Sequence, residues 1–184
     1  VDADDLIEEV IQEARDMSVE RGEIVSMNDL DKEKIMQIIG LGALKFFIIK
    51  VQPKKRMIFD PKESVDMQGQ TGPYIQNAYV RIQSVKRKAS EKPLIGYDDY
   101  FEINDQEKTL IKQLINFPDV IREAGNLYDP SSVANYAYTL AKEFHRFYHD
   151  VRILNGETEA AKSFRIQLSS IVGEVIKSSL DLLG

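Results

Sequence analysis

The chain contains no cysteine, no tryptophan and only two histidines among its 184 residues. Without cysteine, disulfide bonds and thiolate metal sites are excluded. No apolar run approaches the roughly 20 residues that a membrane-spanning helix needs, and the acidic first residues do not resemble a secretory signal peptide. Hydrophobic residues make up 43% and charged residues 29% of the sequence, which is typical of a globular protein. We therefore expect a cytoplasmic protein with no membrane partner.

The sequence also lacks the common catalytic motifs. Gly40-Leu41-Gly42 has no third glycine and no strand–turn–helix context, so no phosphate-binding loop is predicted. There is no G-x-S-x-G segment, which removes support for a hydrolase triad. The histidines, His145 and His149, are four residues apart, but the stretch His-Arg-Phe-Tyr-His has no glutamate as in the zinc-protease motif. We predict that both are helix-surface histidines with no ligand role, and that the chain binds no metal.

Positive charge is scarce overall but concentrated in one part of the sequence. The net charge is −6. Residues 1–33 hold 12 acids and 3 bases, residues 45–92 hold 11 bases and 4 acids, and residues 93–184 hold 14 acids and 9 bases. A basic middle between acidic flanks is compatible with a phosphate backbone as partner. Charge alone, however, favours the simpler interpretation that these are solvated faces.

The first third of the chain predicts helices followed by a short strand or two. Residues 4–21 have the spacing of an amphipathic helix that ends at Gly22, with an apolar stripe made of Leu6, Val10, Ala14 and Met17. A second helix is predicted over residues 30–39. The nearly continuous apolar run at residues 43–51 suits a buried strand, although the pattern also allows a helix, and residues 57–59 are a candidate partner strand.

A break at residues 69–73, Gly-Gln-Thr-Gly-Pro, precedes a strongly patterned helix. Thr71 is a natural N-cap, and Pro73 belongs in the first helical turn. An apolar seam follows at alternating spacings of three and four: Ile75, Ala78, Ile82, Val85 and Ala89. The basic cluster lies on the other faces of the same helix and consists of Arg81, Lys86, Arg87 and Lys88. The positive charge therefore sits on a helix with a buried side.

The remaining residues predict further helices. Asn104 and Glu107 form a capping-box pattern, Pro118 is expected to open another short helix, and Asp129-Pro130 repeats the cap-then-proline start. Asn155-Gly156 marks the turn before the last helix. The C-terminal half is therefore predicted to be a bundle of about five helices, which makes the whole chain mainly α.

Aromatic residues gather on the helix that follows Pro130. Phe144 and Phe147 lie on its apolar stripe and are assigned to the core. Tyr136, Tyr138 and Tyr148 lie at the edge of the stripe or off it, so that each can present a ring to an unpaired base. Packing in the core or at its rim is the competing interpretation for each tyrosine.

These residues together resemble the anticodon-binding domain of arginyl-tRNA synthetases. Phe59-Asp60 and residues 69–82 follow that family's pattern, roughly FD and then TGPYIQYAHARI, and residues 42–45 resemble its DALR signature. Further along, the family pattern continues as FP, P, Y, LA, F, FY and RLxL. The residues that match it here follow in the same order: Phe117-Pro118, Pro130, Tyr136, Leu140-Ala141, Phe144, Phe147-Tyr148, Arg165 and Leu168.

The sequence departs from the family pattern at several points. Asn77, Tyr79 and Val80 replace the usual Tyr, His and Ala, and Gly42 replaces the Asp of DALR. The HIGH and KMSK motifs of the catalytic domain are absent. The resemblance therefore implies a piece of a larger enzyme, in which residues 1–66 are the end of the catalytic domain and residues 67–184 are the helical anticodon-binding domain.

The resemblance implies a function in tRNA binding. The parent enzyme would ligate arginine to tRNA with ATP and magnesium, whereas this chain alone would bind no cofactor and would be inactive. Its expected partners are an arginine tRNA and the remainder of the catalytic domain, and not DNA. The residues expected to contact the tRNA backbone are Arg81, Lys86, Arg87 and Lys88, and those expected to contact the anticodon loop are Gln76, Asn77, Tyr136 and Tyr148.

Three alternatives stay open at this point. The chain could belong to a related class I synthetase with a helical anticodon-binding bundle, or be a free-standing RNA-binding protein. It could also be a helical protein–protein interaction module that docks through its acidic first helix and has no affinity for tRNA.

Overall fold

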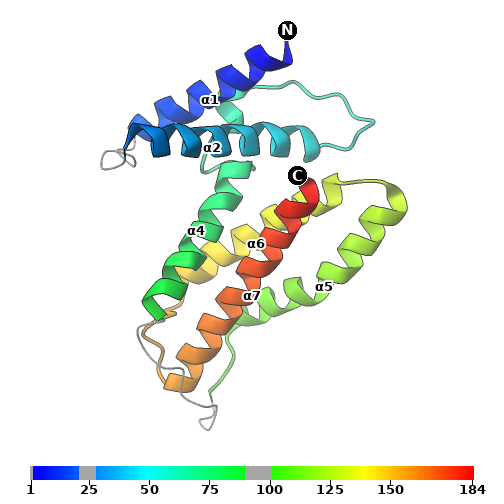
Figure 1. Ribbon diagram of the computed structural model, residues 1–184. Coiled ribbons are helices and arrows are strands. Elements are labelled where there is room, and N and C mark those ends of the chain that lie inside the picture. Colours follow the sequence, from blue (N-terminus) through cyan, green and yellow to red (C-terminus); the bar gives the residue numbers. More distant parts are fainter. Residues whose placement is uncertain (1, 21–27, 90–100) are drawn as a thin grey trace.

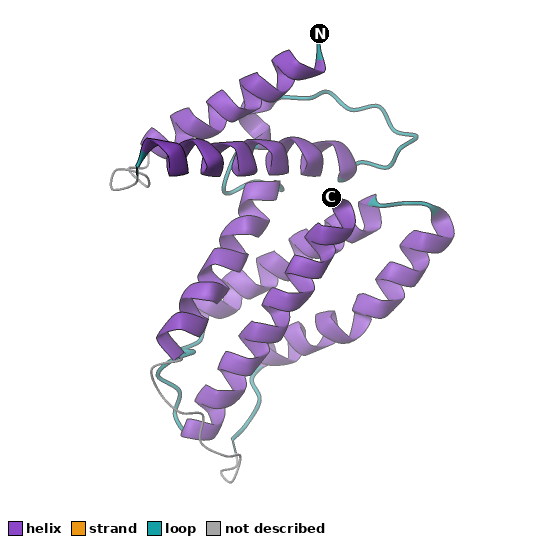
Figure 2. Ribbon diagram, viewed as in Figure 1, coloured by secondary structure: helices purple, strands orange, loops and turns teal. Residues whose placement is uncertain are grey.

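The computed structural model describes residues 2–20, 28–89 and 101–184, and within these ranges it contains helices and no strand (Figure 2). The mainly α fold is thereby confirmed. No described helix is long and apolar enough to cross a membrane. The elements are α1 (Ala3–Glu20), α2 (Asp29–Ile49), α3 (Pro61–Ser64), α4 (Gly72–Ala89), α5 (Asp105–Leu127), α6 (Ser131–Asp150) and α7 (Glu159–Leu183).

The long helices form a bundle with a helix pair across one end. Helices α6 and α7 lie between α4 and α5, while α1 and α2 lie side by side over the start of α4 and the end of α7 (Figure 1). The C-terminus consequently lies beneath α2. Gly22, the expected end of the first helix, and most of the expected linker at residues 90–103 lie outside the described residues.

The predicted strand at residues 43–51 is wrong, because residues 43–49 are the last third of α2, which also runs past the helix end predicted at residue 39. The nearly continuous apolar run arises because α2 is covered on two sides. Met36, Ala43 and Leu44 pack with α1, whereas Phe46 packs into the bundle core. A helix buried on both sides has no single apolar stripe, so it resembles a buried strand in sequence. Residues 57–59 likewise form no strand.

The predicted helix start at Pro118 is also wrong, because α5 runs through it, and residues 72–89 and 101–184 contain four long helices where about five were predicted. A proline inside a helix removes one backbone hydrogen bond and costs about 3 kcal/mol. Its neighbours Leu114, Phe117 and Val120 all pack against the core cluster. These side chains are partly buried, so each contributes less than the roughly 1.5–3 kcal/mol of full burial, but together they offset the local cost.

The other predicted helix starts are confirmed by their hydrogen bonds. The Thr71 hydroxyl oxygen accepts a bond from the Tyr74 amide at 3.3 Å, and a carboxylate oxygen of Asp129 accepts one from the Ser131 amide at 3.0 Å. Asn104 and Glu107 form a complete capping box at the start of α5. Each of these caps satisfies an amide that the first helical turn leaves without a backbone partner.

Glu107 has a second role, because it is also half of a buried ion pair. Its side chain is fully buried, and its Oε1 accepts a hydrogen bond of 2.6 Å from Nε of Arg165, which is almost fully buried. The other oxygen accepts the capping bond from the Asn104 amide. Arg165 also donates to Glu157 at 2.9 Å. With both charges compensated inside the protein, this pair fixes the start of α5 against α7.

Gly72 allows α2 to cross the start of α4, and the absence of a side chain at Gly42 leaves room there for the Gln76 amide. A Cβ atom on Gly72 would lie 2.4 Å from the carbonyl oxygen of Gly42, and one on Gly42 would lie 2.5 Å from Nε2 of Gln76. Real Cβ atoms do not approach other atoms this closely. The predicted boundary at residues 66 and 67 falls in the segment between α3 and α4, close to this crossing, and stays a prediction.

Replacing Gly72 with alanine is expected to destabilise the protein by about 1–3 kcal/mol, because the methyl group forces the two backbones apart. Gly125→Ala is the matched control, since its Cβ would meet nothing within 4 Å, and it is expected to stabilise α5 by about 0.5–1 kcal/mol. The measurement is the free energy of unfolding in urea. Equal stability of the two variants would contradict the close crossing.

Candidate nucleic-acid interface

The basic face, which we define as Arg81, Lys86, Arg87 and Lys88, occupies the C-terminal half of α4. Arg81, Arg87 and Lys88 are exposed, and Lys86 is partly exposed, with its ammonium group 3.6 Å from a carboxylate oxygen of Glu174 on α7. Cations near a helix C-terminus are stabilised by the helix dipole. All four predicted backbone-contact residues lie on one rigid element, spread around its circumference: Arg81 lies toward α6 and Lys86 toward α7, and Lys88, two turns after Arg81, lies on the same side as Arg81. Held on one helix, they are suited to the phosphates of a nucleic acid.

Arg81 is oriented by a contact between α4 and α6. Its Nη1 lies 2.9 Å from Nδ1 of His145, and Nε2 of the same ring lies 3.3 Å from the carbonyl oxygen of Tyr74. Arginine only donates hydrogen bonds and a carbonyl only accepts them. Nδ1 of His145 must therefore be unprotonated and Nε2 must carry the proton, so the imidazole is neutral in this arrangement.

The surroundings of His145 favour this neutral form. Burial lowers the pKa of His145 below its ordinary value of 6.5; the hydrogen bond with the Tyr74 carbonyl opposes this shift, and the positive charge of Arg81 adds to it. The prediction that His145 is a surface histidine is therefore wrong, because its ring is half-buried and packs against the Tyr74 ring at 4.7 Å. His149 is exposed, as predicted.

Tyr148 is the predicted loop-contact tyrosine that lies at the surface. Its side chain is on α6, one turn after His145, and 37% of it is exposed. The Arg81 guanidinium lies 5.4 Å from the centre of the Tyr148 ring, within the range of a cation–π interaction. Arginine and tyrosine thus form one surface that combines positive charge with an aromatic face.

Tyr136, in contrast, is part of the core. Only 6% of it is exposed, its ring stacks on Phe117 at 5.4 Å, and its hydroxyl donates a 2.9 Å hydrogen bond to the backbone oxygen of Gln113. Burial raises the pKa of Tyr136 to about 12. The ring has no free face on which a base could stack. Its position agrees with the alternative interpretation, in which Tyr136 packs in the core.

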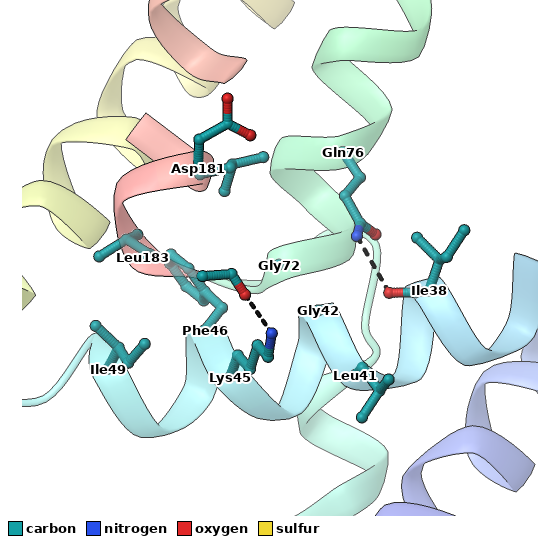
Figure 3. A pocket seen from close by; sticks show the side chains of 12 residues that line it. Ile38, Leu41, Gly42, Lys45, Phe46, Ile49, Gly72, Gln76, Asp181 and Leu183 are labelled. Carbon is teal, nitrogen blue, oxygen red and sulfur yellow. Dashed lines mark hydrogen bonds between the residues drawn. The ribbon is translucent and has the colours of Figure 1, made fainter. Parts of the chain in front are cut away.

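Gln76 and Asn77 lie beside an apolar groove between α2, α4 and α7. The groove has a volume of about 640 Å³, and its walls include Ile38, Ile39 and Val80. A smaller cavity of about 360 Å³, which also includes Gln76, adjoins it under the C-terminus (Figure 3). Nε2 of Gln76 is 3.4 Å from the backbone oxygen of Ile38, while its buried Oε1 has no hydrogen-bond partner.

Sequence reasoning missed one residue at this interface. His145 was assigned no role, although the structure places it between Arg81 and Tyr74. No pattern in the sequence indicates the contact between Arg81 and His145, because it depends on how α4 and α6 pack.

The family model of the DALR anticodon binding domain matches residues 75–184 of this sequence. The chain belongs to that family. The chain is also 47% identical to the arginine–tRNA ligases of Parabacteroides distasonis and Phocaeicola vulgatus. Each alignment extends over 187 residues and covers the whole chain. The chain spans 31% of the length of each of these relatives.

Solved structures show the same similarity. The whole chain superposes on part of the arginyl-tRNA synthetase of Thermus thermophilus with a TM-score of 0.86 and 29% identity, covering 31% of that chain. The arginyl-tRNA synthetase of Plasmodium falciparum gives a TM-score of 0.86 and 26% identity, with 32% of that chain covered. The similarity includes α1 and α2, which lie outside the family match.

Lowering the pH is expected to destabilise the protein through His145. Because burial lowers the pKa of this residue in the folded state, the unfolded chain takes up the proton first as the pH falls below 6.5. The stabilising contribution is therefore complete above pH 6.5 and is lost at lower pH. Urea unfolding between pH 7.5 and 5 measures this loss. It is expected to be smaller in His145→Asn, and equal losses in both proteins would contradict the assignment.

Proposed function

We propose that this chain binds the anticodon arm of an arginine tRNA as part of an arginine–tRNA ligase. The observation that supports this most strongly is the basic face of α4 beside the Arg81–Tyr148 surface, within an anticodon-binding domain family member. The relatives are named arginine–tRNA ligases, which supports arginine tRNA as the substrate and argues against a related synthetase or a free-standing RNA-binding protein. A cytoplasmic location stays a prediction.

The proposed binding combines two kinds of contact. The ammonium and guanidinium groups of the basic face neutralise phosphates, which holds the RNA without reading its sequence. Tyr148 offers a partly exposed ring for stacking on an unpaired base, and Asn77 carries an amide group that can reach a base edge from α4. The Gln76 amide faces the Ile38 carbonyl under α2, which supports a structural role for it in this arrangement. The buried position of Tyr136 supports a structural role for that residue instead.

Catalysis is assigned to the part of the ligase outside this chain. The described residues contain no group of three or more His, Cys, Asp or Glu side chains that could hold a metal ion, and the sequence has no phosphate-binding loop. Because the HIGH and KMSK motifs of the catalytic domain are also absent from this sequence, we propose that the chain alone is inactive. The remainder of the catalytic domain is the proposed partner of α1 and α2, where several large apolar side chains are exposed: Val19, Leu30, Ile38 and Ile48.

The alternative is a protein–protein interaction module that uses α1. Asp4, Asp5, Glu8 and Glu9 of this helix are exposed, and an acidic face of this kind suits a basic protein partner. This alternative predicts no affinity for tRNA and no effect of changing the basic face.

A fluorescence-anisotropy titration with an arginine tRNA, at several salt concentrations, tests the proposal. We expect salt-sensitive binding that weakens when one anticodon base is changed. In Lys86→Gln/Arg87→Gln/Lys88→Gln, the slope of log K against log salt is expected to become shallower by about 2, since each phosphate contact contributes about 0.7–0.9.

The matched control removes three exposed cations from α5, in Lys108→Gln/Lys112→Gln/Arg122→Gln. It changes the net charge by the same amount but leaves α4 intact, so its slope is expected to stay close to that of the original protein. Equal effects of the two triple variants would indicate a nonspecific charge effect. The absence of any binding would favour the interaction module.

A further inference from the structure

We propose that His145 is a positioning residue for RNA binding, which holds the Arg81 guanidinium beside the Tyr148 ring so that the two contact RNA as one surface. This inference rests on the proposed function and adds a residue to it. His145 itself is half-buried between α4 and α6, so it acts on RNA through Arg81 and not by direct contact.

The geometry gives His145 one partner on each side of its ring. The Arg81 side donates to Nδ1 at 2.9 Å, and Nε2 faces the Tyr74 carbonyl at 3.3 Å. Tyr74 is two helical turns before Arg81 on α4, so both contacts lie on the same face of that helix. The ring is also packed edge-on against the Tyr74 ring at 4.7 Å. The imidazole is therefore fixed in orientation before Arg81 reaches it.

A fixed acceptor matters because the arginine side chain is long and mobile. Ordering such a side chain costs up to about 2 kcal/mol of conformational entropy. The bond to His145 orders Arg81 in the free protein, and the guanidinium is then held 5.4 Å from the Tyr148 ring. RNA binds a surface that is already in place, which reduces the entropy lost on binding.

The imidazole must be neutral for this role, and the groups around it are as follows. Arg81 and Tyr74 face His145 from α4. On α6, Glu143 lies 3.4 Å from Arg146, and His149 pairs with Asp150 at 2.7 Å, while Tyr138 and Tyr148 lie one to two turns away. A protonated Nδ1 would direct an N–H group at the Arg81 cation, which removes the acceptor and adds repulsion. Positioning of Arg81 is therefore a property of the neutral ring.

Two substitutions of His145 separate its two hydrogen bonds. In His145→Asn, the amide oxygen can take the place of Nδ1 and keep the bond from Arg81. In His145→Gln, the amide nitrogen can take the place of Nε2 and keep the bond to the Tyr74 carbonyl, but the acceptor for Arg81 is lost. Both variants are uncharged at every pH of the experiment. Thermal unfolding of each variant verifies that it is folded before binding is measured.

The test is a double-mutant cycle in the full 184-residue chain, with arginine tRNA affinity as the readout at pH 7.5. His145→Gln is expected to bind about three- to tenfold more weakly, the equivalent of one hydrogen bond, and His145→Asn within about twofold of the original protein. Adding His145→Gln to Arg81→Gln is expected to cause little further loss, because the histidine acts only through the arginine. The coupling is expected to weaken once the pH is low enough to protonate His145, which burial moves below its ordinary pKa of 6.5.

The outcomes distinguish this inference from the proposed function. If the original protein binds no tRNA, the proposed function fails and the inference fails with it. If the original protein binds tRNA but His145→Gln binds equally well, only the positioning role is overturned. Fully additive losses for Arg81→Gln and His145→Gln would also overturn it, since they would show that the two residues act independently.

Discussion

The close crossing of α2 over the start of α4 is the constraint on which the arrangement depends. Gly72 lets the start of α4 approach the backbone of α2 at Gly42 to a distance that no side chain would allow. Because the crossing places α2 over the end of the bundle, Phe46 enters the bundle core while Met36 packs against α1. Asn135 strengthens the same junction by bonding the Lys50 carbonyl at 3.1 Å. The start of α4 is thereby fixed, and the basic face farther along the helix has a defined position relative to α1 and α2.

Local patterns in the sequence predicted most of the helices, and the errors have a common physical cause. The caps at Thr71 and Asn104 involve residues close in sequence, so they could be recognised without knowledge of the fold. The second half of α2 could not, because its apolar residues face two different cores and therefore show no single helical stripe. Pro118 is the opposite case. Proline is a strong local signal for a helix boundary, but the packing of its neighbours keeps α5 continuous through it. Local chemistry is thus predictable where tertiary contacts do not compete with it.

The same distinction applies to the candidate site. The basic face is a property of one helix, and the sequence predicted its residues and their common element. Tyr136 and Tyr148 looked equivalent in the sequence, and only the packing of α5 against α6 separates a buried ring from an exposed one. The contact between Arg81 and His145 joins residues 64 positions apart, so no local pattern could indicate it. The structure therefore adds the arrangement between helices, which turns a set of charges into a surface.

The central claim is that the bundle holds the anticodon arm of a tRNA against α4. Hydroxyl-radical footprinting of an arginine tRNA bound to this chain tests that claim most directly, because it shows which nucleotides the protein covers. We expect protection concentrated in the anticodon loop and its stem, and reduced there by the triple substitution in the basic face. Protection confined to the acceptor stem, or spread evenly over the tRNA, would contradict the claim.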